Sequence, residues 1–213
     1  MPRLPALVAL LLSAAMQAVL AQGDFKPVDQ AAAQPDFFAF RARLQAAVAR
    51  RDKEAVLAVI HKDIKNSFGG NGGVDEFKQV WELDKPGTPL WEELAQVLSL
   101  GGSFMGDGRF VAPYVFSRWP SGTDPYGFVA VIGTGVRVRA EASASAMSTH
   151  SLSFEIVEEL QTRATNDAWV AVILADGKTG FVDKRFVRSP LDYRAIFEMS
   201  AGRWQITMFI AGD

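Results

Sequence analysis

Short apolar stretches separated by turn signals fill the second half of this chain, and they constrain its fold more than any other feature. The run VRVRA at 136–140 alternates apolar and basic residues, as a strand with one buried face does. The runs at 152–156 and 169–174 predict two further strands. Asp176-Gly177 suits a tight hairpin turn before a return strand at 180–182. Several short strands with turns between them predict a small, closed β-barrel.

Three places in residues 126–187 resemble the bacterial SH3-like domains. The run VRVRAEAS at 136–143 is similar to the first strand motif of that family, with Val138 and Arg139 at matching positions. Trp169 matches the Trp that commonly precedes the long strand of these domains. The run DGKTGFV at 176–182 is the closest match, with Phe181 in place of the usual Trp. The resemblance implies a small barrel of the kind found in envelope and cell-wall proteins.

The resemblance also implies a binding role, in which loop residues contact a cell-wall peptide or a protein partner. Trp169 and Phe181 are interpreted as core residues more than as contact surface, although both belong to the candidate set. The candidate ligand-binding residues are Trp119, Tyr126, Arg139, Trp169 and Phe181. Cysteine peptidases often accompany such domains, but a chain without cysteine cannot use that chemistry.

The first residues have the layout of a secretory signal peptide. Arg3 precedes an apolar run, and small or branched residues lead to a cleavage point after Ala21. The alternative is an uncleaved membrane anchor, because the apolar stretch approaches the lower length limit for a span. The small residues near the end of the stretch favour cleavage, so residues 1–21 are predicted to be removed. This places the mature protein in the periplasm or outside the cell. No later segment is long and apolar enough to predict a stable membrane span.

Charge and cysteine content exclude several partners and sites. The formal net charge of −2 gives no reason to expect nucleic acid as a partner. The absence of cysteine excludes a lipid-modified Cys anchor and any Cys-based zinc site. His61 and His150 stand in neither an HxH nor an HExxH spacing, so we predict no metal site and no cofactor.

Residues 36–120 predict a small α+β domain, preceded by a flexible lead-in at 22–35. A helix that opens at Pro35-Asp36 has an apolar stripe of Phe37, Phe40, Leu44, Ala47 and Val48. Its polar face carries Arg41, Arg43, Arg50 and Arg51. This basic face suits a solvated helix surface, and the alternative is a patch for a membrane or an anionic polymer.

Helix-capping and turn residues predict the next elements. Asp52 is the expected N-cap of a short helix to Ile60, followed by a strand at 64–68. The glycine-rich loop at 69–73 precedes another helix, and it is either a flexible turn or a weak phosphate-binding loop. Thr88-Pro89 opens a further helix that Gly101 ends.

A hairpin at 104–116 completes this part of the chain, and a linker follows at 117–125. Pro113 cannot donate a ladder hydrogen bond, so its strand is expected at a sheet edge or at a bulge. The order of elements faintly resembles the cone-shaped fold of nuclear-transport-factor-like proteins.

The tail at 189–213 predicts a β-hairpin around Ser200-Ala201-Gly202. Tyr193, Ala195, Phe197 and Met199 are expected on one strand face, and Trp204, Ile206, Met208 and Ile210 on another. Such a hairpin is too apolar to stand alone in water. We therefore expect it to return and pair with the 110–116 region, so that the barrel at 126–188 is an insertion or a side lobe clamped by the chain. The fold class is α+β.

No set of residues predicts catalysis, and no catalytic residue is assigned. Asp75/Glu76 and Glu92/Glu93 could supply paired carboxylates, but adjacent helix positions point in different directions. The preferred hypothesis is an exported, non-catalytic envelope protein that binds a peptidoglycan peptide or an envelope protein. The alternative is a small-molecule-binding or hydrolytic pocket in the N-terminal α+β domain, where helices close a curved sheet. A third hypothesis is a structural role in oligomer assembly.

Overall fold

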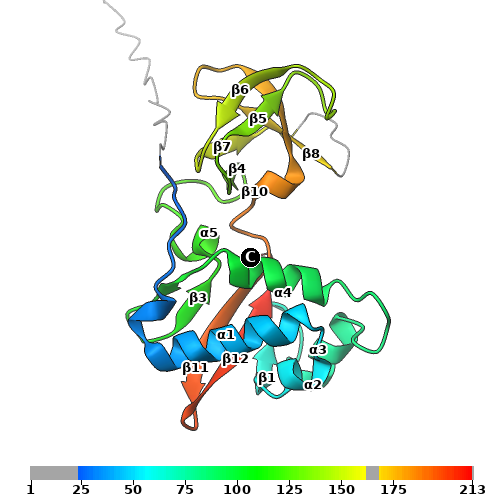
Figure 1. Cartoon of the computed structure of the whole chain (residues 1–213), viewed down its shortest axis with the longest axis vertical. Coiled ribbons are helices and arrows are strands. Elements are labelled where there is room, and N and C mark those ends of the chain that lie inside the picture. The colour runs from blue at the N-terminus through cyan, green and yellow to red at the C-terminus, as the bar shows by residue number, and fades with distance from the viewer. Residues whose placement is uncertain (1–23, 162–167, 213) are drawn as a thin grey trace, which may run out of the picture.

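The computed structural model describes residues 24–161 and 168–212, which form an α+β protein with two β-sheets (Figure 1). This confirms the predicted fold class. The proposed signal peptide lies outside the described residues. The seven-stranded sheet comes from a single stretch of chain that is inserted between β3 and β11 of the five-stranded sheet.

The C-terminal hairpin occupies the centre of the five-stranded sheet. Its strands are β11 (Arg194–Ser200) and β12 (Arg203–Ile210). On one side β12 pairs in parallel with β1 (Ile60–Lys65). On the other side β11 pairs with β3 (Phe110–Ala112), which in turn pairs with β2 (Ser103–Phe104). The predicted pairing of the tail with the 110–116 region is confirmed, with Phe197 opposite Phe110.

Helices cover one face of this sheet (Figure 1). They are α1 (Pro35–Ala49), α2 (Lys53–Leu57), α3 (Val74–Val80) and α4 (Leu90–Ser99). The predicted apolar stripe of α1 is confirmed, because all five of its residues are buried. Phe37 is the centre of an aromatic cluster, with its ring centroid 4.3 Å from that of Phe110 and 4.8 Å from that of Trp204.

Several local predictions need correction. Asp52 does cap α2, since its carboxylate accepts the Ala55 N–H at 3.0 Å, but the helix ends at Leu57 and β1 already begins at Ile60. Pro113 lies beyond β3 and precedes the short helix α5 (Tyr114–Ser117). Because β3 pairs with β2 and β11 on its two sides, it is neither an edge strand nor bulged at this proline.

The lead-in is bound to the body of the protein from Phe25 onward, where the Phe25 N–H donates to the Phe154 carbonyl at 2.6 Å, which corrects the expectation of a flexible segment. Asp29 forms a β-bridge with Gly102 and precedes the 3₁₀ helix η1 (Ala31–Ala33). Its carboxylate accepts two hydrogen bonds from Arg41, at 2.7 and 2.6 Å. Burial would raise the pKa of Asp29, but Arg41 holds that pKa below its ordinary value. Arg41 is buried by this ion pair, so it does not belong to an exposed basic face.

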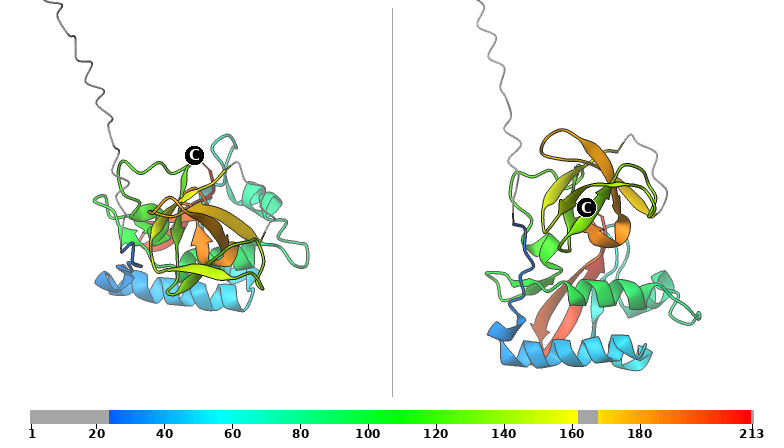
Figure 2. Two further views of the ribbon diagram at one scale, coloured as in Figure 1. Left: turned by 90° about the horizontal axis from the view of Figure 1, so that it is seen from above. Right: turned by 45° about the horizontal axis from the view of Figure 1, so that its top comes forward.

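The seven-stranded sheet curls around its own apolar core (Figure 2). Its strand order is β10-β4-β7-β8-β9-β5-β6, and every adjacent pair is antiparallel. The strands are β4 (Phe128–Val131), β5 (Val136–Arg139), β6 (Ser148–Leu152), β7 (Ile156–Glu159), β8 (Trp169–Ile173), β9 (Thr179–Asp183) and β10 (Val187–Arg188).

Two predictions for this region are corrected. The run 152–156 is not one strand, because Phe154 adopts a positive φ of 52° and separates β6 from β7. Within the described residues, β10 and β6 remain the two edges and no pairing joins them. The sheet is therefore curled and open, and the predicted closed barrel is not confirmed.

The two sheets are joined by a buried arginine and an apolar cluster. Arg188 on β10 donates to Gln96 (2.5 Å) and Glu93 (2.9 Å) of α4, and to the Tyr193 carbonyl (2.7 Å). The apolar cluster includes Phe25, whose ring packs against those of Tyr114 and Trp119. Gly212, the last described residue, donates its N–H to the carbonyl of Leu191, in the segment that follows β10, at 2.7 Å.

Candidate functional site

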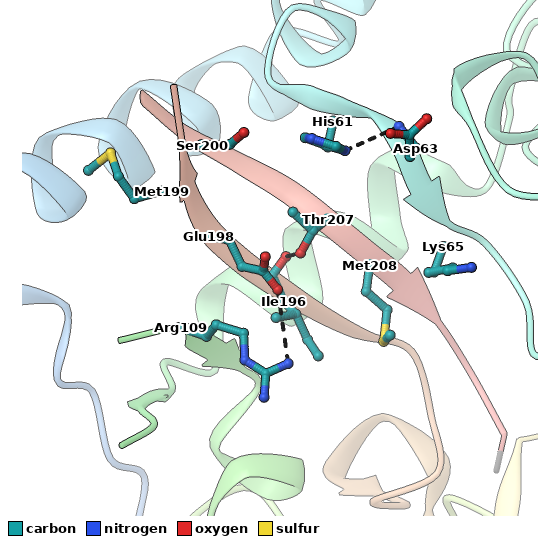
Figure 3. A pocket seen from close by; sticks show the side chains of 10 residues that line it. All are labelled: His61, Asp63, Lys65, Arg109, Ile196, Glu198, Met199, Ser200, Thr207 and Met208. Carbon is teal, nitrogen blue, oxygen red and sulfur yellow. Dashed lines mark hydrogen bonds and ion pairs between the residues drawn. The ribbon is translucent and has the colours of Figure 1, made fainter. Parts of the chain in front are cut away.

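A pocket of about 350 Å³ lies on the open face of the five-stranded sheet, opposite the helices (Figure 3). Its walls come from β1 and β11, and β12 forms its floor. It is lined by His61, Asp63, Lys65, Arg109, Ile196, Glu198, Met199, Ser200, Thr207 and Met208. This volume is at the lower end of the range for small-ligand sites.

Strand alternation and two shifts in pairing register place these side chains on the open face, one shift between β1 and β12 and one between β11 and β12. Along β1, Ile60 and Ile64 point into the core, so His61, Asp63 and Lys65 point outward. In β12 the pairing register shifts between Ile206 and Met208, so that Thr207 is the extra residue of a bulge.

The bulge changes which residues of the hairpin are buried. Phe209 enters the core, while Met208 lines the pocket, so the expectation that Met208 shares a face with Trp204 and Ile206 is wrong. Met199 also lines the pocket and is exposed, although it was expected beside Ala195 and Phe197.

Three ion pairs set the charges on opposite sides of the pocket. The Arg109 guanidinium lies 2.6 Å from the Asp107 carboxylate and 3.9 Å from that of Glu198. On β1, the Lys62 ammonium lies 2.7 Å from the Asp63 carboxylate. This hydrogen bond is the main reason why the pKa of Asp63 is lowered, and His61 and Lys65 lower it further.

His61 is in β1, which begins at Ile60, the residue at which the preceding helix was predicted to end. Its Nδ1 accepts the Asp63 main-chain N–H at 3.1 Å, so the neutral ring carries its proton on Nε2. Lys65 has no ion pair within 4 Å among the described residues. The pocket thus offers free cationic and hydrogen-bonding groups, and an ionised carboxylate of low pKa is poorly matched to general acid–base work near neutral pH.

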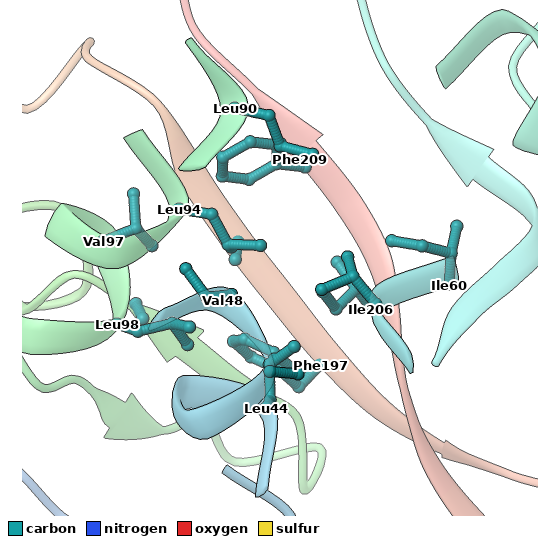
Figure 4. Packing of buried hydrophobic residues seen from close by; sticks show 14 of the residues in the cluster. Leu44, Val48, Ile60, Leu90, Leu94, Val97, Leu98, Phe197, Ile206 and Phe209 are labelled. Carbon is teal, nitrogen blue, oxygen red and sulfur yellow. The ribbon is translucent and has the colours of Figure 1, made fainter. Parts of the chain in front are cut away.

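The space between the sheet and the helices, where a concave apolar pocket was the alternative prediction, is filled by side chains (Figure 4). Leu94, Val97 and Leu98 from α4 meet Leu44 and Val48 from α1 there. Phe197, Ile206 and Phe209 enter the same core from the hairpin. Such packing does not favour a small-molecule site in the interior of this domain.

The glycine-rich loop binds a carboxylate of the chain itself. Glu76 accepts hydrogen bonds from the Gly72 N–H at 2.7 Å and the Asn66 side-chain amide at 3.0 Å. The Gly73 N–H donates to the Ile64 carbonyl at 2.7 Å. These amides are therefore not available to a phosphate, and the loop instead covers the outer edge of β1.

The other paired acids are engaged separately. Asp75 pairs with Lys78, and Glu92 pairs with Arg51. Glu93, next in sequence to Glu92, instead accepts from the buried Arg188. These carboxylates serve different contacts, so they do not form the two-carboxylate arrangement that glycoside hydrolysis needs.

The structure brings three of the five predicted ligand-binding residues together. Trp169 and Phe181 are buried in one small cluster, and Arg139 is paired with Phe181 across β5 and β9. Tyr126 is 59% exposed and lies two residues before the start of β4. Trp119 lies in the cluster between the sheets, where its indole N–H donates to the Thr123 carbonyl. Tyr126 and Arg139 are thus the members of the set with accessible polar groups.

Sequence reasoning missed the pocket. Lys65, Arg109 and Glu198 come from separate parts of the chain and share no motif. The one sequence pattern that bears on the pocket is the alternation of Ile60 and Ile64 with polar residues. This pattern predicts that the strand has an exposed face, but it does not predict a pocket in that face.

Within residues 24–161 and 168–212, no group of three or more His, Cys, Asp or Glu residues is arranged to hold a metal ion. None of the helices in the same ranges has the length and apolar character needed to cross a membrane. Comparison of the chain with models of known protein families gives no match, and comparison with curated proteins gives none either.

Proposed function

We propose that this chain is an exported binding protein of the bacterial cell envelope, which holds a peptide from the cell wall or from a protein partner without transforming it. The observation that carries the proposal is the pocket on the open sheet face, with charges of both signs around it. The signal-peptide layout at 1–21 supports export, and the SH3-like motifs at 136–182 support a cell-wall setting.

The chemistry of the pocket suits a peptide. Ser200 offers a hydroxyl group for amide hydrogen bonds. The Thr207 hydroxyl donates to the Ile196 carbonyl at 3.3 Å, and its oxygen can accept an amide N–H. Ile196 and Met208 offer apolar contact. Asp63 is held ionised by Lys62, and the acids of α3 and α4 are engaged in structural contacts. These features favour binding over catalysis.

Retention on purified peptidoglycan tests the proposal. The chain from Gln22 onward is incubated with wall sacculi, which are then sedimented and washed. We expect retention of the wild type and loss of retention in the pocket variant Lys65→Met/Glu198→Gln. The matched control is Tyr126→Ala/Arg139→Met on the seven-stranded sheet, which is expected to be retained like the wild type.

The outcomes separate the ligand from the site. A wild type that stays in the supernatant removes the wall peptide as the ligand. Loss of retention in the control variant alone would move the binding site to Tyr126 and Arg139 on the other sheet.

A further inference from the structure

The β1 side of the pocket carries a net positive charge. Residues 61–65 include Lys62, Asp63 and Lys65, two cations and one anion, and so have a net charge of +1 when His61 is neutral. Lys62 and Asp63 neutralise each other at 2.7 Å. The Lys65 ammonium and the Nε2–H of His61 remain to meet a ligand anion.

The opposite side carries a net negative charge. Asp107, Arg109 and Glu198 are two anions and one cation. Arg109 is bound closely to Asp107, and its 3.9 Å distance to Glu198 is longer than a hydrogen bond. The Glu198 side chain is 40% exposed, so its carboxylate is accessible to a ligand cation.

The strand register gives the distance between the two charges. β1 and β11 flank β12, so their axes are about 10 Å apart. Lys65 pairs with Met208 and Glu198 pairs with Gln205, which sit three residues apart along β12. That offset adds roughly 10 Å along the strands, so the two Cα atoms are roughly 14 Å apart. Thr207 and Met208 lie between them (Figure 3).

We infer that the pocket binds a short zwitterionic peptide in one direction, with its C-terminal carboxylate at Lys65 and its N-terminal ammonium at Glu198. An extended tripeptide is about 10 Å long, and the two side chains cover the remaining distance. The inference rests on the proposed function and adds the length and direction of the ligand. Reversing the peptide would place like charges together at both ends of the pocket.

Isothermal titration calorimetry with trialanine tests the inference on the chain from Gln22 onward. Four forms of the peptide are compared: free, N-acetylated, C-amidated and blocked at both ends. We expect the free peptide to bind most tightly and each block to weaken binding by about fivefold to tenfold.

Two variants assign the ends. Lys65→Met is expected to bind the free and amidated peptides alike while still distinguishing the acetylated one. Glu198→Gln is expected to show the opposite pattern. Lys85→Met is the matched control, because it removes the same charge from an exposed residue between α3 and α4 that does not line the pocket, and it is expected to distinguish all four peptides.

Equal binding of the four peptides to the wild type would overturn the inference, as would unchanged discrimination by both pocket variants. Failure of every trialanine form to bind would also overturn it. If the protein is nevertheless retained on the wall through the pocket, the proposed function stands without this ligand. If retention fails as well, both proposals are wrong.

Discussion

Individual buried side chains determine how the seven-stranded sheet is packed and attached. Trp169 packs with Ala171 and Phe181 on one face of the sheet, away from the cluster of valines inside the curl. Tyr114 is fully buried at the junction between the sheets, and its hydroxyl has no hydrogen-bond partner among the described residues. The first is a packing contact of large area, whereas the second carries the cost of a buried polar group.

Replacing Trp169 with alanine should lower the free energy of unfolding by about 3–5 kcal/mol, because a large side chain is removed from a small core. Guanidinium denaturation measures the change. Tyr126→Ala is the control, since a side chain that is 59% exposed should cost little. A denaturation midpoint unchanged by Trp169→Ala would show that this cluster does not stabilise the sheet.

Tyr114 makes stability depend on pH in the alkaline range. Burial raises the pKa of Tyr114 to about 12 in the folded protein. Because the unfolded state ionises first, stability is full below about pH 10 and falls as the pH rises toward 12. Tyr114→Phe should remove about 2 kcal/mol of this loss between pH 10 and 12. Urea denaturation of both proteins across that range measures it, and parallel pH profiles would contradict the prediction.

At the level of secondary-structure elements, the glycine-rich loop has a structural role. Gly72 has a φ of 77°, and a Cβ there would lie 2.8 Å from the Ile64 carbonyl oxygen. The loop can therefore lie against β1 only with glycine at this position. Glu76 then binds the loop from the first turn of α3. The Gly73 N–H occupies the Ile64 carbonyl on the edge of β1, so that carbonyl is not available for pairing with another chain.

Gly72→Ala should destabilise the protein by about 1–3 kcal/mol, because the new methyl group meets main-chain atoms in a left-handed conformation. Gly69→Ala is the matched control in the same loop. A Cβ at Gly69 has no atom within 4 Å, so a change within about 0.5 kcal/mol is expected. Chemical denaturation of both variants checks the difference, and equal stabilities would mean that the loop is not held against β1.

Considered as a whole, the protein has two separate apolar cores, and a smaller apolar cluster lies at the junction between them. Arg188 is the main polar link, and it is 3% exposed. Its removal would leave Glu93 without its cation and the Tyr193 carbonyl without a donor. The hydrogen bonds of Arg188 couple the unfolding of the two cores. We therefore expect the wild type to unfold in one calorimetric transition.

Arg188→Met should lower the stability by about 2–4 kcal/mol and separate the unfolding of the two sheets into two transitions. Differential scanning calorimetry measures both effects. Arg185→Met is the control, since Arg185 is exposed. Among the described residues, its ion-pair partner is Asp183. A single unshifted transition in Arg188→Met would show that the apolar cluster alone joins the sheets.

The local patterns in the chain were sufficient to predict the elements and their buried faces. The stripe of α1, the Asp52 cap and the C-terminal hairpin were all foreseen, because each depends on residues a few positions apart. Arg41 was misplaced because its partner, Asp29, is twelve residues away and outside the helix.

Long-range pairing settled what the local patterns left open. The bulge at Thr207 turned Met208 toward the pocket, and the positive φ of Phe154 divided one predicted strand into two. The pocket exists because β1 and β11, more than a hundred residues apart in the chain, lie on either side of β12. Strand alternation is a property of neighbouring residues, so the sequence alone predicts it. Register, sheet closure and pocket shape depend on which distant strands pair, so only the tertiary structure determined these three features.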